Sequence, residues 1–197
     1  LDLADARDAL AGIVFSVIAH ELVHAWLPVS LFPREDPWVK EGFTSFYGYA
    51  FAARGGWIGP ATVDRLFAKY DEGVFGDVDL EEVELSDPRL WYEEYSGENW
   101  RRVTYDRGFA VGLLLDVYLR TETDNRKSLD DVLPVLFGRH RHRGFDRDAF
   151  MAAIEDGTGV DARAFFSRWV DSTEVPEPRL VDDAMRQAIE FGAFARD

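Results

Sequence analysis

The spacing of apolar residues along the chain predicts a mainly helical fold. Apolar residues recur at three- and four-residue intervals between Asp2 and Trp26, which is the period of an α-helix. The stretch LPVSLFPREDP then breaks the pattern, because proline removes a backbone donor and clashes inside a helix. A second helix is expected from Pro37 or Trp38 to about Arg54, where Gly55-Gly56 provides a stop.

The rest of the chain continues the helical pattern after one irregular stretch. A third helix is expected after Pro60, whereas Gly73 to Val103 is acidic and aromatic without a sustained period and is expected to be irregular. STEVPEPRL, from Ser172 to Leu180, is interpreted as a linker. Strand signals are few. The later helices are expected at Thr104 to about Arg120, Ser128 to about Arg139, Asp146 to Ile154, Asp161 to Val170 and Val181 to about Phe194. Ser128 and Asp131 are expected to cap the start of the helix that begins at Ser128.

Charge and composition narrow the possible partners. The chain has a formal net charge of -15, from 22 Lys+Arg against 37 Asp+Glu. Such a surface repels phosphate backbones and anionic lipids, so we expect no nucleic-acid partner. The run from Leu10 to Leu27 matches a membrane span in length, but it carries His20, Glu21 and His24. It is therefore expected to be a core helix, with no membrane insertion.

The lack of cysteine and the start of the chain bear on the chemistry and the setting of the protein. The absence of cysteine excludes disulfides, thiolate zinc ligands and thiol nucleophiles. No signal peptide is recognisable, and the chain begins at Leu1 directly in a helical pattern, so we expect a piece of a longer protein. The expected setting is soluble, cytoplasmic or periplasmic. The oligomeric state is not predicted.

The segment HELVH, at residues 20–24, has the residue types and spacing of a catalytic zinc site. On a helix, residues four apart lie about 40° apart in azimuth and one turn apart, so His20 and His24 can direct their imidazoles at one cation. Glu21 is rotated by about 100° from His20 and can reach a water molecule beside that cation. Two histidines with a glutamate base are typical of zinc proteases.

A third protein ligand is needed, and Glu41 is the candidate. No cysteine and no further histidine follows the motif closely, and His140 and His142 lie in the basic stretch GRHRHRG, where we assign them no catalytic role. Glu41 stands near the start of an otherwise apolar and aromatic helix, where a buried carboxylate needs a strong partner. Two histidines, one glutamate and a water make a four-coordinate catalytic Zn²⁺ site.

HELVHAW followed by WVKEGFTSFYG resembles the gluzincin zinc metallopeptidases, and EGFT is typical of their aminopeptidase branch. VTYDRGFAVGLLLDVYLR, SLDDVLPVLF and AFFSRWVDSTEVP are similar to segments of the glycyl aminopeptidase family. The resemblance implies the helical part of a thermolysin-like catalytic domain over residues 1–175, with residues 176–197 as a linker and a helix that packs on it. It further implies a β-rich part upstream that forms one wall of the cleft.

The resemblance also assigns roles to individual residues. His20, His24 and Glu41 would be the zinc ligands, Glu21 the general base, and Tyr105 the hydrogen-bond donor to the oxyanion. Arg107 stands where such families more often have lysine, a mild change if it pairs with a surface carboxylate.

The expected function is zinc-dependent hydrolysis of peptide bonds, with aminopeptidase activity on a peptide substrate. Three alternatives remain at this point. The first is a zinc endopeptidase or amidase. The second is a non-catalytic peptide-binding module with an aromatic cleft (Trp38, Phe43, Trp91, Trp100), although these residues are favoured as core. The third is a structural helical domain without metal.

Overall fold

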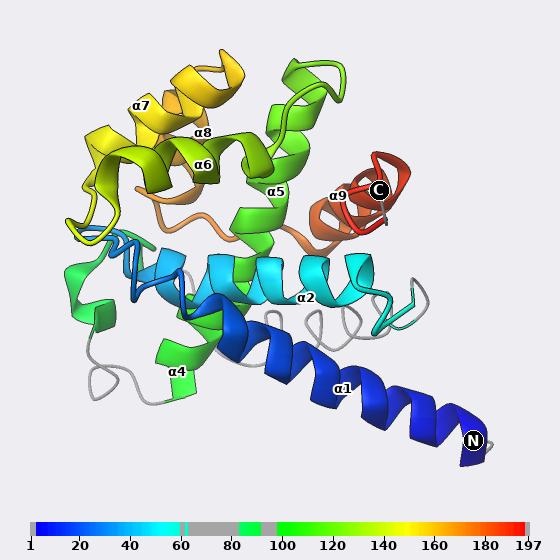
Figure 1. Ribbon diagram of the computed structural model, residues 1–197. Helices are drawn as coiled ribbons and strands as arrows, with labels where there is room; N and C mark the ends of the chain where they lie inside the picture. Colours follow the sequence, from blue (N-terminus) through cyan, green and yellow to red (C-terminus); the bar gives the residue numbers. More distant parts are fainter. Residues whose placement is uncertain (1–2, 60–61, 63–82, 92–97, 196–197) are drawn as a thin grey trace.

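The computed structural model describes residues 3–59, 62, 83–91 and 98–195, and it is helical (Figure 1). Within these ranges no strand is present, and one isolated bridge joins Pro33 to Phe145. The mainly α prediction is confirmed. The elements are α1 (Leu3–Val23), the π-helical turn η1 (Val39–Phe43), α2 (Thr44–Arg54), the 3₁₀ turn η2 (Pro88–Trp91), α4 (Glu98–Arg101), the π-helical turn η4 (Arg102–Arg107), α5 (Gly108–Glu122), α6 (Leu129–His140), α7 (Arg147–Thr158), α8 (Arg163–Trp169) and α9 (Pro178–Glu190).

Several predicted boundaries are wrong, among them the end of α7, which lies at Thr158 rather than Ile154, and one predicted element cannot be compared. Helical structure before α5 begins at Glu98 rather than Thr104, because Thr104 and Trp100 join α4 to η4 through a side-chain hydrogen bond of 2.7 Å. α9 begins at Pro178 rather than Val181, since proline suits the first turn of a helix. The helix expected after Pro60 falls outside the described residues.

Two close backbone approaches fix η1 and α2 between their neighbours. A Cβ added at Gly48 would lie 3.0 Å from the Cα and N of His20, so α2 passes directly against α1 at the HELVH motif. A Cβ at Gly42 would lie 2.4 Å from the carbonyl carbon of Gly108, at the start of α5. A side chain would clash with backbone at Gly42 and be crowded at Gly48, and the Gly48 contact holds α1 against the helix that continues from η1.

An aromatic core lies beneath η1. Trp38 and Phe43 are buried, with their ring centroids 5.2 Å apart, and Phe43 lies 5.7 Å from Phe150 of α7. Phe150 in turn meets Phe166 of α8 edge to face at 5.5 Å. The interpretation of Trp38 and Phe43 as core residues is confirmed, and this packing holds the Glu41 turn on a rigid base.

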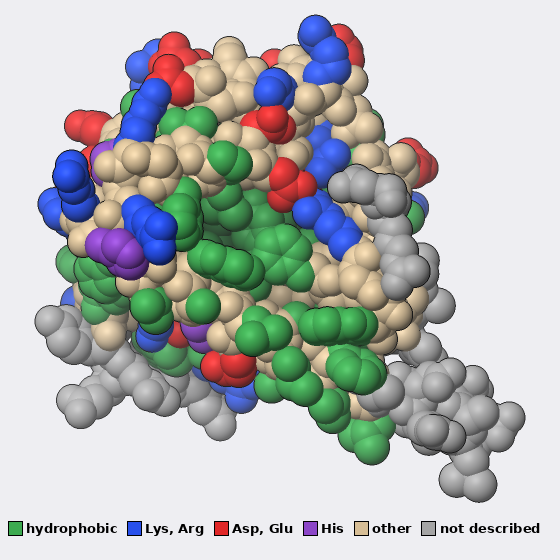
Figure 2. Space-filling model, in the orientation of Figure 1, with side chains coloured by type: hydrophobic (Ala, Val, Ile, Leu, Met, Phe, Trp, Pro, Cys, Tyr) green, Lys and Arg blue, Asp and Glu red, His purple; other side chains and the backbone are tan. Residues whose placement is uncertain are grey.

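α1 is not buried on all sides, contrary to the expectation of a core helix. Its buried stripe consists of small and medium residues such as Ser16, Ala19 and Val23, which face the protein. Leu10, Val17, Leu22 and other apolar residues are exposed, and apolar side chains follow α1 across the lower right of Figure 2. In the part of the chain that is described, no helix combines the length and apolar character needed to cross a membrane.

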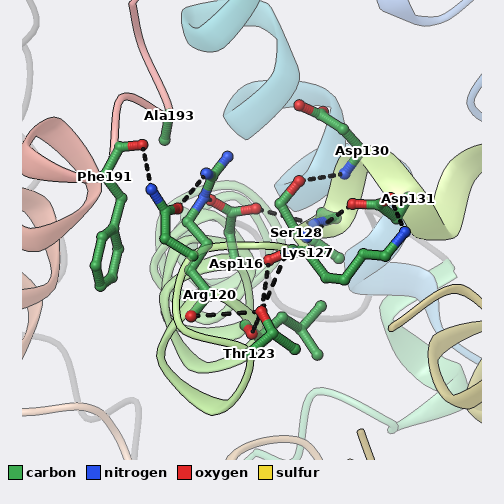
Figure 3. A network of polar contacts seen from close by, with 12 residues as sticks. Asp116, Arg120, Thr123, Lys127, Ser128, Asp130, Asp131, Phe191 and Ala193 are labelled. Atoms are coloured by element: carbon green, nitrogen blue, oxygen red, sulfur yellow. Dashed lines mark hydrogen bonds and ion pairs between the residues drawn. The ribbon is translucent and has the colours of Figure 1, made fainter. Parts of the chain in front are cut away.

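A polar network joins α5, α6 and the end of the chain (Figure 3). The buried carboxylate of Asp116 accepts hydrogen bonds from Arg120 Nε at 2.7 Å and from the Leu129 N–H at 3.0 Å. Ser128 and Asp131 form the predicted capping box at the start of α6, which confirms that signal. The network therefore fixes the short connection between two helices, one of which, α5, also packs on η1.

Candidate active site

The last turn of α1 presents both motif histidines to η1. α1 ends at Val23, and the His24 N–H still donates to the His20 carbonyl at 3.3 Å, so the one-turn spacing is kept. The Nε2 atoms of His20 and His24 lie 3.4 and 3.5 Å from the same atom, Oε2 of Glu41. The structure thus brings together the three residues that were predicted as ligands.

These three atoms have the separation of ligands around one tetrahedral ion. Ligand atoms about 2.0–2.1 Å from a tetrahedral zinc lie about 3.4 Å from one another. Glu41 Oε2 is buried and has no hydrogen-bond partner among the described residues, which is costly for a carboxylate oxygen unless a cation satisfies it. The arrangement therefore fits a metal ion such as Zn²⁺, held by His20, His24 and Glu41.

Hydrogen bonds behind the histidines orient both rings. His24 Nδ1 lies 2.7 Å from the Leu27 carbonyl oxygen, and because a carbonyl can only accept, His24 donates from Nδ1 and keeps the Nε2 lone pair free. His20 Nδ1 lies 3.3 Å from Ser45 Oγ on α2. Such outer contacts fix the tautomer and the direction of a metal-binding imidazole.

Glu41 is ionised in this setting. Burial by itself would raise the pKa of its carboxyl group, but His20, His24 and Lys40 outweigh that effect and hold the pKa well below its usual range. Conversely, the Glu41 carboxylate raises the pKa of His24, against the opposing effect of burial. The negative charge of Glu41 is therefore the main electrostatic feature that a cation would meet.

Glu21 lies beside the ligand cluster. Ligand-type atoms of His20, Glu21 and His24 all lie within 4.8 Å of one another. Glu21 is nevertheless exposed, whereas Glu41 is buried and nearly equidistant from both histidines. This geometry favours Glu41 as the third ligand, and it leaves the Glu21 carboxylate accessible to a water molecule.

Tyr105 reaches the same place from η4. Its ring stacks on the His20 ring, with centroids 5.7 Å apart and planes inclined by 15°. Burial, followed by the nearby Glu41 carboxylate, raises the pKa of Tyr105 above its usual range. The phenol therefore stays protonated and can donate a hydrogen bond.

Comparison with known proteins agrees with this geometry. The Peptidase family M1 domain matches residues 3–169. The chain belongs to peptidase family M1. The M1 chain is 22% identical over 177 residues to glutamyl aminopeptidase of Bos taurus, and 24% identical over 175 residues to aminopeptidase M1 of Arabidopsis thaliana. Each alignment covers 83% of this chain, but only 17% and 18% of the respective relative, so the chain spans less than a fifth of their length.

Membership of family M1 confirms the predicted resemblance to gluzincin aminopeptidases. The narrower likeness to the glycyl aminopeptidase family stays a prediction. Within the M1 chain, the assignment of individual ligands and catalytic groups also stays a prediction, which the geometry above supports.

Among the described residues, Arg107 does not pair with a surface carboxylate. Its side chain is fully buried, and its guanidinium donates to the carbonyl of Val83 and, at 2.9 Å each, to those of Ser172 and Glu174. Burial lowers the pKa of Arg107 to about 10. The residue therefore ties η4, which carries Tyr105, to two distant segments.

Sequence reasoning missed the supporting contacts around the ligands. Ser45 and the Leu27 carbonyl orient the two histidines, and Lys40 Nζ lies 3.1 Å from Glu41 Oε1. Lys40 could have been noticed as the residue before the predicted ligand. The other two contacts depend on how α2 and the turn after α1 lie, for which the sequence has no direct signal.

Other candidate positions in the M1 chain lie apart from this cluster. His140 is at the end of α6 and His142 is exposed, and within the described ranges neither forms a hydrogen bond or ion pair with the predicted site residues. An apolar hollow of about 920 Å³ lies between the end of α1, α2 and α6, near the centre of Figure 2. Its lining includes Trp26, Phe51 and Leu133 but none of the predicted catalytic or ligand residues, so it is not the catalytic cleft.

Proposed function

We propose that the chain is the zinc-binding part of a peptidase that hydrolyses peptide bonds, with aminopeptidase activity. The observation that carries the proposal is the convergence of His20 Nε2, His24 Nε2 and the unpartnered Glu41 Oε2 at 3.4 to 3.5 Å. Membership of family M1 supports peptidase chemistry. The aminopeptidase names of both relatives support attack at the amino end of a peptide.

Each group in the site has a distinct role in this proposal. His20, His24 and Glu41 would hold Zn²⁺. When bound, the ion would lower the pKa of a water molecule to about 7 and would polarise the scissile carbonyl. Glu21 accepts the proton of the attacking water and returns it to the leaving amine, which is general acid–base catalysis by a single carboxyl group.

Tyr105 completes the set by donating its phenolic hydrogen bond to the oxyanion of the tetrahedral intermediate. The ring contacts His20, Trp100, whose centroid lies 5.8 Å away, and the guanidinium of Arg101, 6.0 Å from the ring centroid. A donor that is already in place needs no reorganisation when the negative charge develops.

Replacing the base tests the mechanism directly. In the intact protein, Glu21→Gln should retain zinc but lose hydrolysis by about 10²- to 10⁴-fold, the contribution typical of general acid–base catalysis. His20→Ala should lose zinc. Metal content by elemental analysis and kcat/KM on peptides are the measurements. Cleavage by Glu21→Gln at the wild-type rate would falsify the role of Glu21, and full zinc occupancy in His20→Ala would contradict the ligand assignment.

The cleavage position needs its own experiment. Amino-acid amides report removal of an amino-terminal residue, whereas internally quenched peptides with blocked ends report cleavage within a chain. Faster hydrolysis of the amides is expected. Activity confined to the blocked peptides would instead assign an endopeptidase.

The domain division is proposed on the same footing. Residues 1–175 would form the catalytic domain, and residues 176–197 a linker and helix packed on it. Contacts between α9 and α5 support this packing.

The non-catalytic alternative relied on an aromatic cleft that includes Trp38 and Phe43. Both side chains are buried, so neither can line such a cleft.

A further inference from the structure

The two oxygens of the Glu41 carboxylate have different partners. Oε2 faces the Nε2 atoms of the two histidines, whereas Oε1 lies 3.1 Å from the ammonium group of Lys40. The Glu41 side chain is 3% exposed and that of Lys40 is 37% exposed. Lys40 therefore reaches from the rim of the site to the far side of the predicted ligand.

We propose that Lys40 is a positioning residue that makes Glu41 a one-oxygen metal ligand, and this rests on the proposed zinc function. A carboxylate can bind a metal through one oxygen or through both. An ammonium group that holds Oε1 by a charge-assisted hydrogen bond removes that oxygen from competition for the ion. The fourth position of a four-coordinate site is then left for water or substrate.

The alternative is that Lys40 forms an ordinary exposed ion pair with no effect on the site. Exposed pairs contribute little because water screens both partners. Here one partner is buried and is itself the predicted ligand, so Lys40 also supplies a counter-charge within the site. With that charge present, Glu41 neutralises less of the charge of the ion, which keeps the ion a stronger Lewis acid.

A substitution that removes the ammonium group tests the proposal. In the intact protein, Lys40→Met should tighten zinc binding by about 10-fold, because the variant loses a positive charge beside the ion and frees Oε1 of Glu41 as a second ligand oxygen. Zinc affinity is measured by competition with a chelator of known affinity. X-ray absorption of the zinc-loaded variant should show an additional oxygen ligand, and the Co²⁺-substituted variant should show weaker visible absorption, as five-coordinate cobalt does.

Lys127→Met is the matched control, because Lys127 also pairs with a carboxylate, Asp131, at 2.7 Å but stands at the start of α6. It should leave zinc affinity and both spectra unchanged. Wild-type affinity together with an unchanged coordination number in Lys40→Met would overturn the role of Lys40. That outcome is distinct from failure of the proposed function, in which the wild-type protein itself would bind no zinc at His20, His24 and Glu41.

Discussion

At the scale of single residues, Tyr105 is the predicted catalytic group whose placement depends most on the fold. Tyr105 is not part of any metal-binding motif in the sequence. It was predicted only because the segment around it resembles a segment of a known family. The structure places its ring 5.7 Å from the His20 ring. Because the pKa of Tyr105 is raised, the hydroxyl is a donor and not an anion at neutral pH.

Removing this hydroxyl should slow the reaction without disturbing the metal. Tyr105→Phe keeps the ring that stacks on His20 but loses the donor to the oxyanion. We expect a fall in kcat/KM of about 10²- to 10³-fold, equivalent to about 2.7–4 kcal/mol, with zinc content unchanged. Steady-state kinetics on the preferred peptide substrate measure this effect.

Tyr118→Phe is a suitable control for that experiment. Tyr118 lies on α5 and donates to the Asp161 carbonyl at 3.3 Å, away from the predicted ligands. Loss of this hydroxyl should leave kcat/KM within about twofold of wild type, since it removes one hydrogen bond away from the predicted site. Equal losses in both variants would argue against a specific role for the Tyr105 hydroxyl.

Residue types carried most of the site prediction. His20, Glu21 and His24 follow from a spacing that has few other physical uses, and Glu41 follows from the cost of a buried carboxylate. Lys40 was not assigned, because its value depends on which of the two Glu41 oxygens it contacts. Which oxygen Lys40 contacts depends on side-chain geometry, and neither the composition nor the periodicity of the sequence indicates it.

At the scale of elements, the two π-helical turns are the features that the sequence did not predict. Glu41 lies in η1 and Tyr105 in η4, so both predicted site residues beyond the HELVH motif stand on such turns. π-Helical turns are rare and often occur at functional sites. A π-helical turn rotates the faces of the helix that follows it. The spacing of apolar residues in the sequence varies too much about 3.6 residues to reveal that rotation.

The anchoring of η4 by Arg107 leads to a stability prediction. Arg107→Lys keeps the charge but replaces a fork of donors by one ammonium group, which cannot reach the Val83, Ser172 and Glu174 carbonyls together. Losing one or two of these bonds should lower the free energy of unfolding by about 1–3 kcal/mol. The denaturant midpoint measures the change.

Arg89→Lys provides the comparison for this substitution. Arg89 is exposed on η2 and pairs with the nearby Asp87. The same chemical change there should alter stability by less than about 0.5 kcal/mol. If Arg107→Lys were as mild as Arg89→Lys, the three carbonyl contacts would not be what holds η4.

At the scale of the whole molecule, Arg147 joins the segment before η1 to the segment after α8. Its guanidinium pairs with Asp36, which is 2% exposed, and with Asp171 at 2.8 Å. Asp36 also accepts a hydrogen bond from the Trp38 indole at 3.2 Å. The ion pairs therefore support the base on which the Glu41 turn rests.

Breaking this junction should be costly because a buried charge would lose its partner. Arg147→Met should destabilise the protein by about 3–5 kcal/mol, and Asp36→Asn in the same chain should recover part of that loss. Chemical denaturation of the two single variants and the double variant forms a double-mutant cycle. Strictly additive effects would show that Arg147 and Asp36 do not interact as the distances indicate.

The helical class of the fold was predictable from the sequence, but which helix faces are buried was not. Periodicity identified helices from Leu3 to Glu190, with errors of a few residues at the starts of α4 and α9 and at the ends of α7 and α9. It could not tell which sides of α1 would be covered, because that helix is apolar nearly all round. The fold covers the stripe that carries Ala19 and Val23 and leaves Leu22 exposed.

The two histidines are oriented by different kinds of group, and this bears on how the site tolerates mutation. His24 is held by the backbone carbonyl of Leu27, which every amino acid at position 27 would supply. His20 relies on the Ser45 hydroxyl, which a single codon change can remove. A substitution at position 45 is therefore expected to loosen the orientation of the His20 ring while His20, His24 and Glu41 all remain in place.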